Sequence, residues 1–237
     1  MEKDKMQTNR YSQSRTQTNI DVGLRDHMQS VYNRMGLGVM VTALTAWVVS
    51  SSPDLMMLFL GGPQKWIVML APLAIVWFGF NPARMNSKQL MMAFLGVSFL
   101  YGVSFSVIAL AFAGADIARA FFVTSIMFVG LSIFGYTTKK DLSAIGTFCF
   151  MAIIGVLVVS MIGLFVEYSS GFEMLLNIVV VLAFAGMTAW ETQATKEQYN
   201  SAYGAEMNSR LAWSSALSLY ISFVVMFSHI LSLMSDR

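Results

Sequence analysis

The stretch LSAIGTFCFMAIIGVLVVSMIGLFV, residues Leu142–Val166, carries no charged side chain over its whole length. A helix rises about 1.5 Å per residue and the hydrocarbon core of a bilayer is about 30 Å thick, so this segment is long enough to span a membrane. Because lipid offers no hydrogen-bond partners to an open backbone, the segment is predicted to be helical. The sequence around it is therefore interpreted as that of a membrane protein.

The composition of the whole chain supports this interpretation. Of 237 residues, 56% are hydrophobic and 12% are charged, whereas an ordinary soluble domain has about 25% charged residues. The net charge of +2 is too balanced for the clustered basic surface that nucleic acids require, and no nucleic-acid role is predicted. The lone Cys149 lies in an apolar run and is predicted to be a small buried side chain.

Seven apolar stretches approach the length of a spanning helix. The second is the weakest, because it is short and contains Pro72; six spans is the alternative. Leu55–Leu60, just before it, is interpreted as an interfacial segment or as part of a longer bent helix. The prediction is an all-α integral membrane protein, a seven-helix bundle. The stretches are Val31–Val49, Trp66–Phe80, Leu90–Phe112, Ile117–Tyr136, Leu142–Val166, Phe172–Trp190 and Leu211–Leu233.

The chain divides into a polar part and an apolar part. Residues 1–28 are predicted to form a disordered cytoplasmic tail, and residues 29–237 the transmembrane domain. Apart from residues 193–210 the connections are short, which leaves no room for a soluble catalytic domain. The sequence contains no P-loop, HExxH or GxSxG motif, so neither an enzyme nor a cofactor or metal site is predicted.

The basic residues indicate the orientation, because Lys and Arg near span ends are retained in the cytoplasm. With the N-terminus inside and seven spans, only Lys65, Arg119 and Arg237 lie on the outer side. Without the second span this asymmetry is lost, so the charge pattern also favours seven. The cytoplasmic side then holds twelve: Lys3, Lys5, Arg10, Arg15, Arg25, Arg34, Arg84, Lys88, Lys139, Lys140, Lys196 and Arg210.

Small residues recur at helical spacing in two of the predicted spans. Ser98, Gly102 and Ser106 share one helix face, as do Ser214, Ser218 and Ser222. Small side chains let helices in lipid approach closely, so both stripes are interpreted as packing seams. The alternative is a path for water or ions lined by hydroxyl groups.

Charges near the spans supply the candidate site residues, since a charge in lipid is costly. Glu191 follows the apolar run that ends at Trp190, and its alternative role is that of an ordinary interfacial residue. Arg84 is a positive-inside anchor or a counter-charge to Glu191. Lys139, Lys140 and Asp141 form a compact turn in which Asp141 is predicted to cap the next helix.

Four stretches of the chain resemble the Bax inhibitor family, also called the transmembrane Bax inhibitor motif proteins. They are VYNRMGLGVMVTA (31–43), SIMFVGLSIFGYTTKKDLS (125–143), FAGMTAWETQATK (184–196) and ALSLYISFVVMF (216–227). The resemblance implies seven helices with the last at the centre. It also implies a pH-sensitive calcium leak. In family members that leak calcium, carboxylates of the sixth and seventh helices share a proton and close the pore, and an arginine of the second helix locks it.

Carried onto this chain, the resemblance places the sixth-helix carboxylate on Glu191, where the family usually has Asp, and the arginine on Arg84. The seventh-helix carboxylate falls on Ser222, which cannot ionise. A gate of two acids therefore cannot form from these positions. A Glu191–Ser222 hydrogen bond would close the same mouth, with a pH response that depends on one carboxylate.

The departure at Ser222 places the chain near the proteobacterial branch of the family, some of whose members restrain a membrane-embedded AAA protease. The leading hypothesis is a cation leak or transporter, with calcium as the cation, in the bacterial inner membrane. The alternative is a non-conducting regulator whose partner is such a protease, gripped through the polar tail. Under either hypothesis the protein is surrounded by the lipid bilayer.

Overall fold

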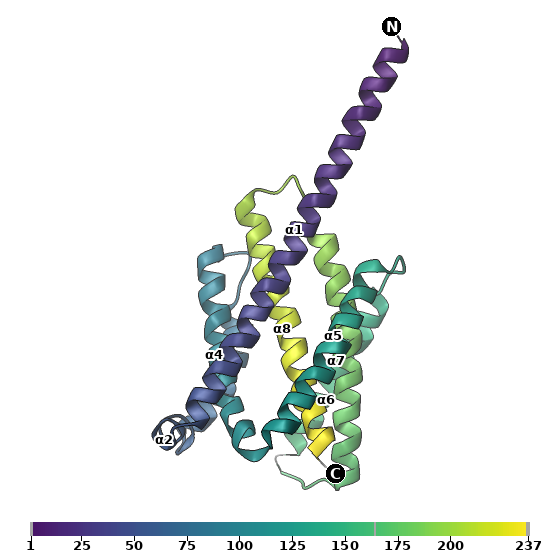
Figure 1. The fold of residues 1–237 in the computed structure, drawn as a ribbon. Helices are drawn as coiled ribbons and strands as arrows, with labels where there is room; N and C mark the ends of the chain where they lie inside the picture. Colours follow the sequence, from purple (N-terminus) through teal and green to yellow (C-terminus); the bar gives the residue numbers. More distant parts are fainter. Residues whose placement is uncertain (1, 164, 236–237) are drawn as a thin grey trace.

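The computed structural model describes residues 2–163 and 165–235, and side chains are described from residue 22 onward. The described residues form helices and no strands (Figure 1). The predicted tail, residues 1–28, lies mostly outside the part whose side chains are described, and its disorder stays a prediction. The elements are α1 (Glu2–Ser50), α2 (Pro53–Leu60), α3 (Gln64–Ala74), the π-helix η1 (Ile75–Gly79), α4 (Ser87–Ala111), α5 (Gly114–Thr137), α6 (Ser143–Ile162), α7 (Ser170–Gln198) and α8 (Ala205–Ser235).

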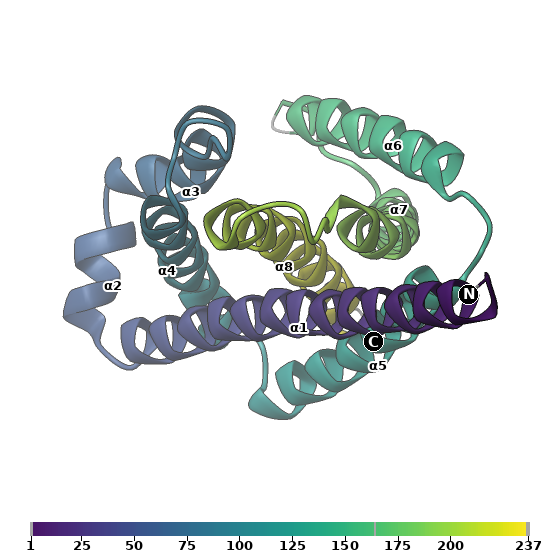
Figure 2. The ribbon, with the colours of Figure 1, turned by 90° about the horizontal axis from the view of Figure 1, so that it is seen from above.

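The last helix, α8, lies at the centre of the bundle. It packs against α1, α4, α5 and α7, and the view along the bundle shows these helices around it (Figure 2). Its buried side chains, such as Tyr220, Phe223 and Met226, form most of the hydrophobic core. The outer helix α6 packs on α7, while α3 packs on α4.

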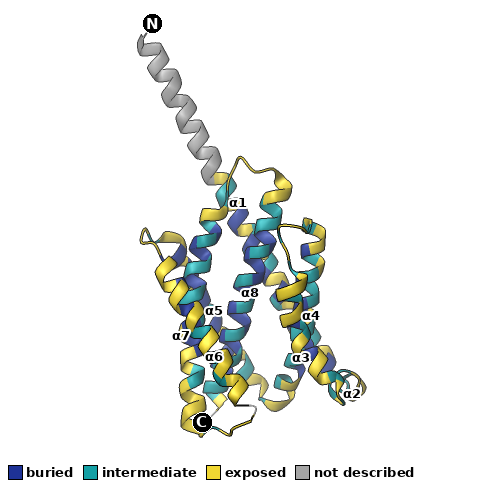
Figure 3. Cartoon of the chain, turned by 180° about the vertical axis from the view of Figure 1, so that it is seen from behind, coloured by how far each residue is buried: buried dark blue, intermediate teal, exposed yellow. Residues whose placement is uncertain are grey.

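The outward faces of the bundle are apolar. On α6 only Gly146 and Cys149 are buried, and large side chains such as Phe148 and Met151 are exposed. The exposed class, yellow in Figure 3, predominates on the outer surface of the bundle. Such a surface suits lipid rather than water. The prediction that Cys149 is buried is confirmed.

Five helices, α4 to α8, are long and apolar enough to cross a membrane. The segment Val22–Ser50 of α1 passes the same criterion only together with α2, from which it is bent by 109°, so the described residues offer up to six spans. The predicted second span corresponds to Gln64–Gly79, which is apolar but too short to be counted. Pro72 lies inside α3, and the helix widens into η1 three residues later.

The predicted seam on α4 is a packing surface. Ser98, Gly102 and Ser106 are all buried. A Cβ atom built on Gly102 would lie 2.6 Å from Thr45 Cβ and 2.7 Å from the carbonyl oxygen of Thr42, both on α1. Only a glycine permits this approach of α4 to α1, so the packing interpretation is confirmed for this stripe.

A hydrogen-bond network that the sequence did not indicate lies beside the seam. The Thr42 hydroxyl is within hydrogen-bond distance of the Tyr220 hydroxyl at 2.7 Å, the Ser98 carbonyl at 2.9 Å and the Gly38 carbonyl at 3.0 Å. Both hydroxyl groups belong to buried residues. The network joins α1, α4 and α8 where no water can replace a lost partner.

Candidate functional site at the α7–α8 interface

Glu191 and Ser222 meet in the structure. The Ser222 hydroxyl donates to Glu191 Oε2 at 2.8 Å, linking α7 to the central helix α8. Ser222 is 1% exposed and Glu191 is partly buried. As predicted, α7 continues past the apolar run to Gln198, so Glu191 projects from a regular helix rather than from a loop.

This contact is compatible with both protonation states of Glu191. A hydroxyl donates to a carboxylate and equally accepts from a carboxylic acid, so protonation changes the charge and leaves the partner in place. In the described part of the chain no basic side chain forms a salt bridge with Glu191, since the one such pair is Arg119 with Asp116. Among the described residues, an ionised Glu191 therefore has no salt-bridge partner to compensate its charge.

Arg84 is not brought to Glu191 as an ion pair. It is exposed in the turn between η1 and α4, and its backbone N–H donates to the Asn81 carbonyl. The arginine that contacts this turn from the central helix is Arg210, which donates to the Pro82 carbonyl. Arg84 is thus an exposed residue of the turn that Arg210 contacts.

The turn is fixed to α8 at a second point. The backbone N–H of Ser87 donates to Glu206 Oε1 at 2.7 Å. Neither Arg210 nor Glu206 was singled out in the sequence, because their partners lie more than 100 positions away and no local spacing indicates them.

The turn Lys139–Lys140–Asp141 is attached to α7. Gln193, two residues after Glu191, donates through Nε2 to the Lys140 carbonyl at 2.9 Å and accepts from the Leu142 N–H at 2.8 Å. The Gln193 side chain that makes these two hydrogen bonds is buried. Both lysine side chains are exposed.

Asp141 lies one residue earlier than a capping residue would. The helix α6 begins at Ser143 with Leu142 at the N-cap position, so the predicted cap is displaced. Asp141 still accepts from the Ser143 N–H at 2.8 Å. Hydrogen bonds from Ser143, the side chain first and then the backbone, hold the pKa of Asp141 below its usual value.

A second polar cluster lies at the opposite end of the α7–α8 interface. His229 Nδ1 is 2.6 Å from Asn177 Oδ1, and Asn177 Nδ2 donates to the Ser232 hydroxyl at 3.3 Å. The position of His229 near the end of the last apolar stretch predicts an interfacial or a hydrogen-bonded side chain, and the structure shows the latter. The position of His27 in the polar N-terminal part of the sequence predicts a solvated side chain, which is wrong, because His27 is 6% exposed and packs on Tyr199.

Phenylalanine rings occupy the region between these two polar ends. Phe223 meets Phe121 and Phe128 edge to face, with ring centroids 5.7 and 5.6 Å apart. Phe227 meets Phe121 and Phe105 at 6.3 and 6.0 Å. We call these five rings the phenylalanine layer; they come from α4, α5 and α8, and Phe128 and Phe223 are buried whereas Phe121 is 45% exposed.

Comparison with known proteins agrees with the resemblance read from the motifs. Residues 24–237 match the family described as Inhibitor of apoptosis-promoting Bax1. The chain belongs to the Bax inhibitor family. Three of the four stretches that carry the family resemblance meet at the site. Gln193, in the stretch 184–196, accepts a hydrogen bond from Leu142, in the stretch 125–143. Ser222, in the stretch 216–227, donates a hydrogen bond to Glu191, in the stretch 184–196.

Several bacterial proteins are similar to this chain over most of its length. A protein of Caulobacter vibrioides is 35% identical, covering 92% of this chain and 91% of its own. A protein of Rickettsia prowazekii (strain Madrid E) is 34% identical, covering 92% of both chains. The inner membrane protein YbhL of Escherichia coli (strain K12) is 31% identical, covering 91% of this chain and 93% of its own. The long apolar helices of this chain and the name of the relative YbhL both indicate a membrane protein.

Proposed function

We propose that this protein is a pH-sensitive cation leak of the bacterial inner membrane, with calcium as the cation. The observation that carries the proposal is the Glu191–Ser222 hydrogen bond near the middle of the central helix. An ionised carboxylate there attracts a cation, whereas a protonated one does not. Rising pH is therefore expected to increase the leak, with Glu191 as the gate carboxylate and Ser222 as its partner.

The phenylalanine layer supports a closed state in this proposal. A constriction lined by apolar rings excludes water and blocks ions without any charged barrier. Opening would require the buried rings of Phe128 and Phe223 to separate. Phe128 belongs to α5, which packs on both α7 and α8, and Phe223 belongs to α8 itself. Arg84 keeps the role of a positive anchor in this scheme, since it does not reach Glu191.

The first test is a change at position 222. Ser222→Asp restores the second carboxylate of the calcium-leaking family members, and two acids in contact resist joint ionisation. The pH at which flux is half-maximal should therefore rise, by about one unit or more. The measurement is calcium-dye flux into proteoliposomes between about pH 5 and 8. Ser218→Asp, one turn earlier on α8, is the control.

Two results would contradict the proposal. One is wild-type protein that passes no calcium at any pH, which would favour the non-conducting regulator of a membrane-bound AAA protease. The other is a pH profile that Ser222→Asp leaves in place, which would separate the leak from the Glu191–Ser222 pair.

The proposed topology has seven membrane spans and a cytoplasmic N-terminus. Its second span is the short segment Gln64–Gly79. The unequal distribution of lysine and arginine supports it. In a Cys149→Ser background, single cysteines at Gln29 and Tyr203 are expected to be labelled from the cytoplasmic side and one at Ser169 from the outer side. Labelling of Gln29 and Ser169 from the same side would reject this topology.

A further inference from the structure

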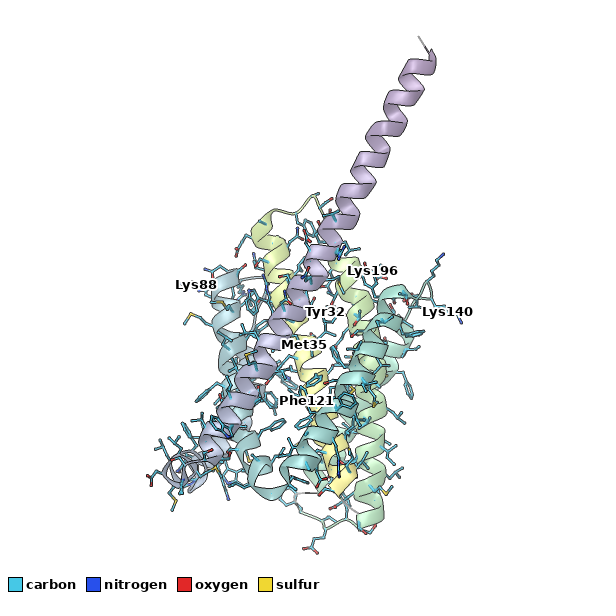
Figure 4. All side chains as sticks on the ribbon, in the orientation of Figure 1. Tyr32, Met35, Lys88, Phe121, Lys140 and Lys196 are labelled. Atoms are coloured by element: carbon cyan, nitrogen blue, oxygen red, sulfur yellow. The ribbon has the colours of Figure 1, made fainter. Side chains whose placement is uncertain are left out.

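A groove runs between α1 and α5 near the end of the bundle that carries most of the basic residues. Its volume is about 690 Å³, and Arg25, Tyr32, Phe128, Ser132, Tyr136 and Thr137 are among its lining residues. The groove exists because α1 and α5 each pack on α8 rather than on each other. Figure 4 shows Tyr32 on α1 below this end, where Lys140 and Lys196 lie.

The groove opens onto the surface that faces lipid. Val129 and Ile133, which also line it, are 55% and 58% exposed. In a membrane protein this surface meets acyl chains, so the molecules that reach the groove sideways are lipids. Its extent is about 10 Å along α1 and about 13 Å along α5, close to the roughly 15 Å depth of one leaflet's hydrocarbon.

One end of the groove is polar and positively charged. Arg25 lines it there, and Lys196 lies 5.2 Å from the ring of Tyr136 and donates to that residue's carbonyl at 3.0 Å. Lys139 and Lys140 follow Thr137 after one intervening residue, Thr138. The neighbouring carboxylates face elsewhere: Asp141 accepts from Ser143, and Asp26 lines a different cavity between α1, α4 and α8.

Deeper in the groove is a buried hydroxyl. Ser132 is 6% exposed, and its Oγ has no hydrogen-bond partner among the described residues. A lipid ester carbonyl is an acceptor that this hydroxyl would satisfy. The walls beyond it, Phe128 and Met28, are apolar.

We propose that this groove binds one anionic glycerophospholipid, with its phosphate at Arg25 and the basic residues beside Tyr136, and one acyl chain between α1 and α5. The bound lipid fills the gap between two helices that both contact the central helix. It would thus stabilise the arrangement of α1 and α5 around α8, whatever ion the protein passes.

The test is native mass spectrometry of the full chain in detergent with equal amounts of phosphatidylglycerol and phosphatidylcholine. The wild type should retain one phosphatidylglycerol in preference to phosphatidylcholine. Arg25→Gln should reduce this preference about fivefold, the effect of one basic residue near a lipid headgroup. Val129→Trp should displace either lipid by filling the groove. Ile126→Trp is the matched control, because Ile126 is 58% exposed on the same helix and does not line the groove.

Equal retention of the two lipids by the wild type, or an unchanged preference in Arg25→Gln, would overturn the assignment of the headgroup. Retention of lipid by Val129→Trp at the level of Ile126→Trp would overturn the groove as the site. The measurement requires no flux, so the lipid proposal and the leak proposal fail independently.

Discussion

Glu191→Gln is expected to leave a protein whose cation flux no longer changes between about pH 5 and 8, the range in which partly desolvated carboxylates titrate. Glutamine has the shape of glutamate and its amide still accepts from Ser222, so the α7–α8 contact persists. What the substitution removes is the proton and the charge. Titration of one carboxylate changes its ionised fraction up to about tenfold per pH unit, and this dependence should vanish.

The measurement is calcium-dye flux in proteoliposomes at matched protein content. Glu197→Gln is the control, because Glu197 lies in the same helix, α7, and is exposed. It should retain the wild-type profile. A Glu191→Gln protein that keeps the wild-type profile would show that another group senses pH, and the role proposed for Glu191 would be wrong.

Gly102→Leu is expected to lower the thermal stability of the bundle far more than Gly155→Leu or Gly171→Leu. The added side chain would meet Thr45 and the Thr42 carbonyl, and α4 would have to move away from α1. Overpacking of this kind costs about 1–3 kcal/mol. The same displacement strains the contact between the Thr42 hydroxyl and the Ser98 carbonyl, which adds to the loss.

Thermal unfolding of the purified protein in detergent would measure the effect, as a fall of roughly 2–12 °C in the midpoint. Gly155→Leu is the matched control, since Gly155 lies inside α6 and nothing lies within 4 Å of a Cβ atom built there. Gly171 directly precedes the apolar stretch Phe172–Trp190, where the sequence predicts a loop, but it lies in the first turn of α7 and is equally open. Equal midpoints for Gly102→Leu and Gly155→Leu would contradict the seam.

The long helices and the α4 seam could be predicted because their signals are local. An uncharged run such as Leu142–Val166 identifies a span by itself, and Ser98, Gly102 and Ser106 identify a face by their spacing. The Glu191–Ser222 contact was predicted through the resemblance, which aligns both positions with a known pair. The number of spans was harder to predict, because Pro72 shortens the segment on which it depends.

What the sequence could not indicate are contacts between residues far apart in the chain. Gln193 is an ordinary polar residue until the structure places it against the backbone of residues 140 and 142. His27 is a tail residue in the sequence, yet it is buried because the α7–α8 connection brings Tyr199 onto it. Nothing in the local sequence distinguishes Arg84 from Arg210 as the arginine that makes a long-range contact. Only the fold shows that Arg210 donates to the Pro82 carbonyl in the turn before α4.

The tethers at the charged end of the bundle divide the molecule mechanically into two bodies. Gln193 fastens the α5–α6 hairpin to α7. The start of α8 is fastened to α1 through Arg34, whose guanidinium donates to the Ser209 carbonyl at 2.7 Å, and to the turn before α4 through Arg210. The Glu191–Ser222 hydrogen bond and the contacts of Asn177 with His229 and Ser232 join one body to the other. Sliding of the two bodies along the α7–α8 interface would therefore have to break these polar contacts, while both sets of tethers stay intact.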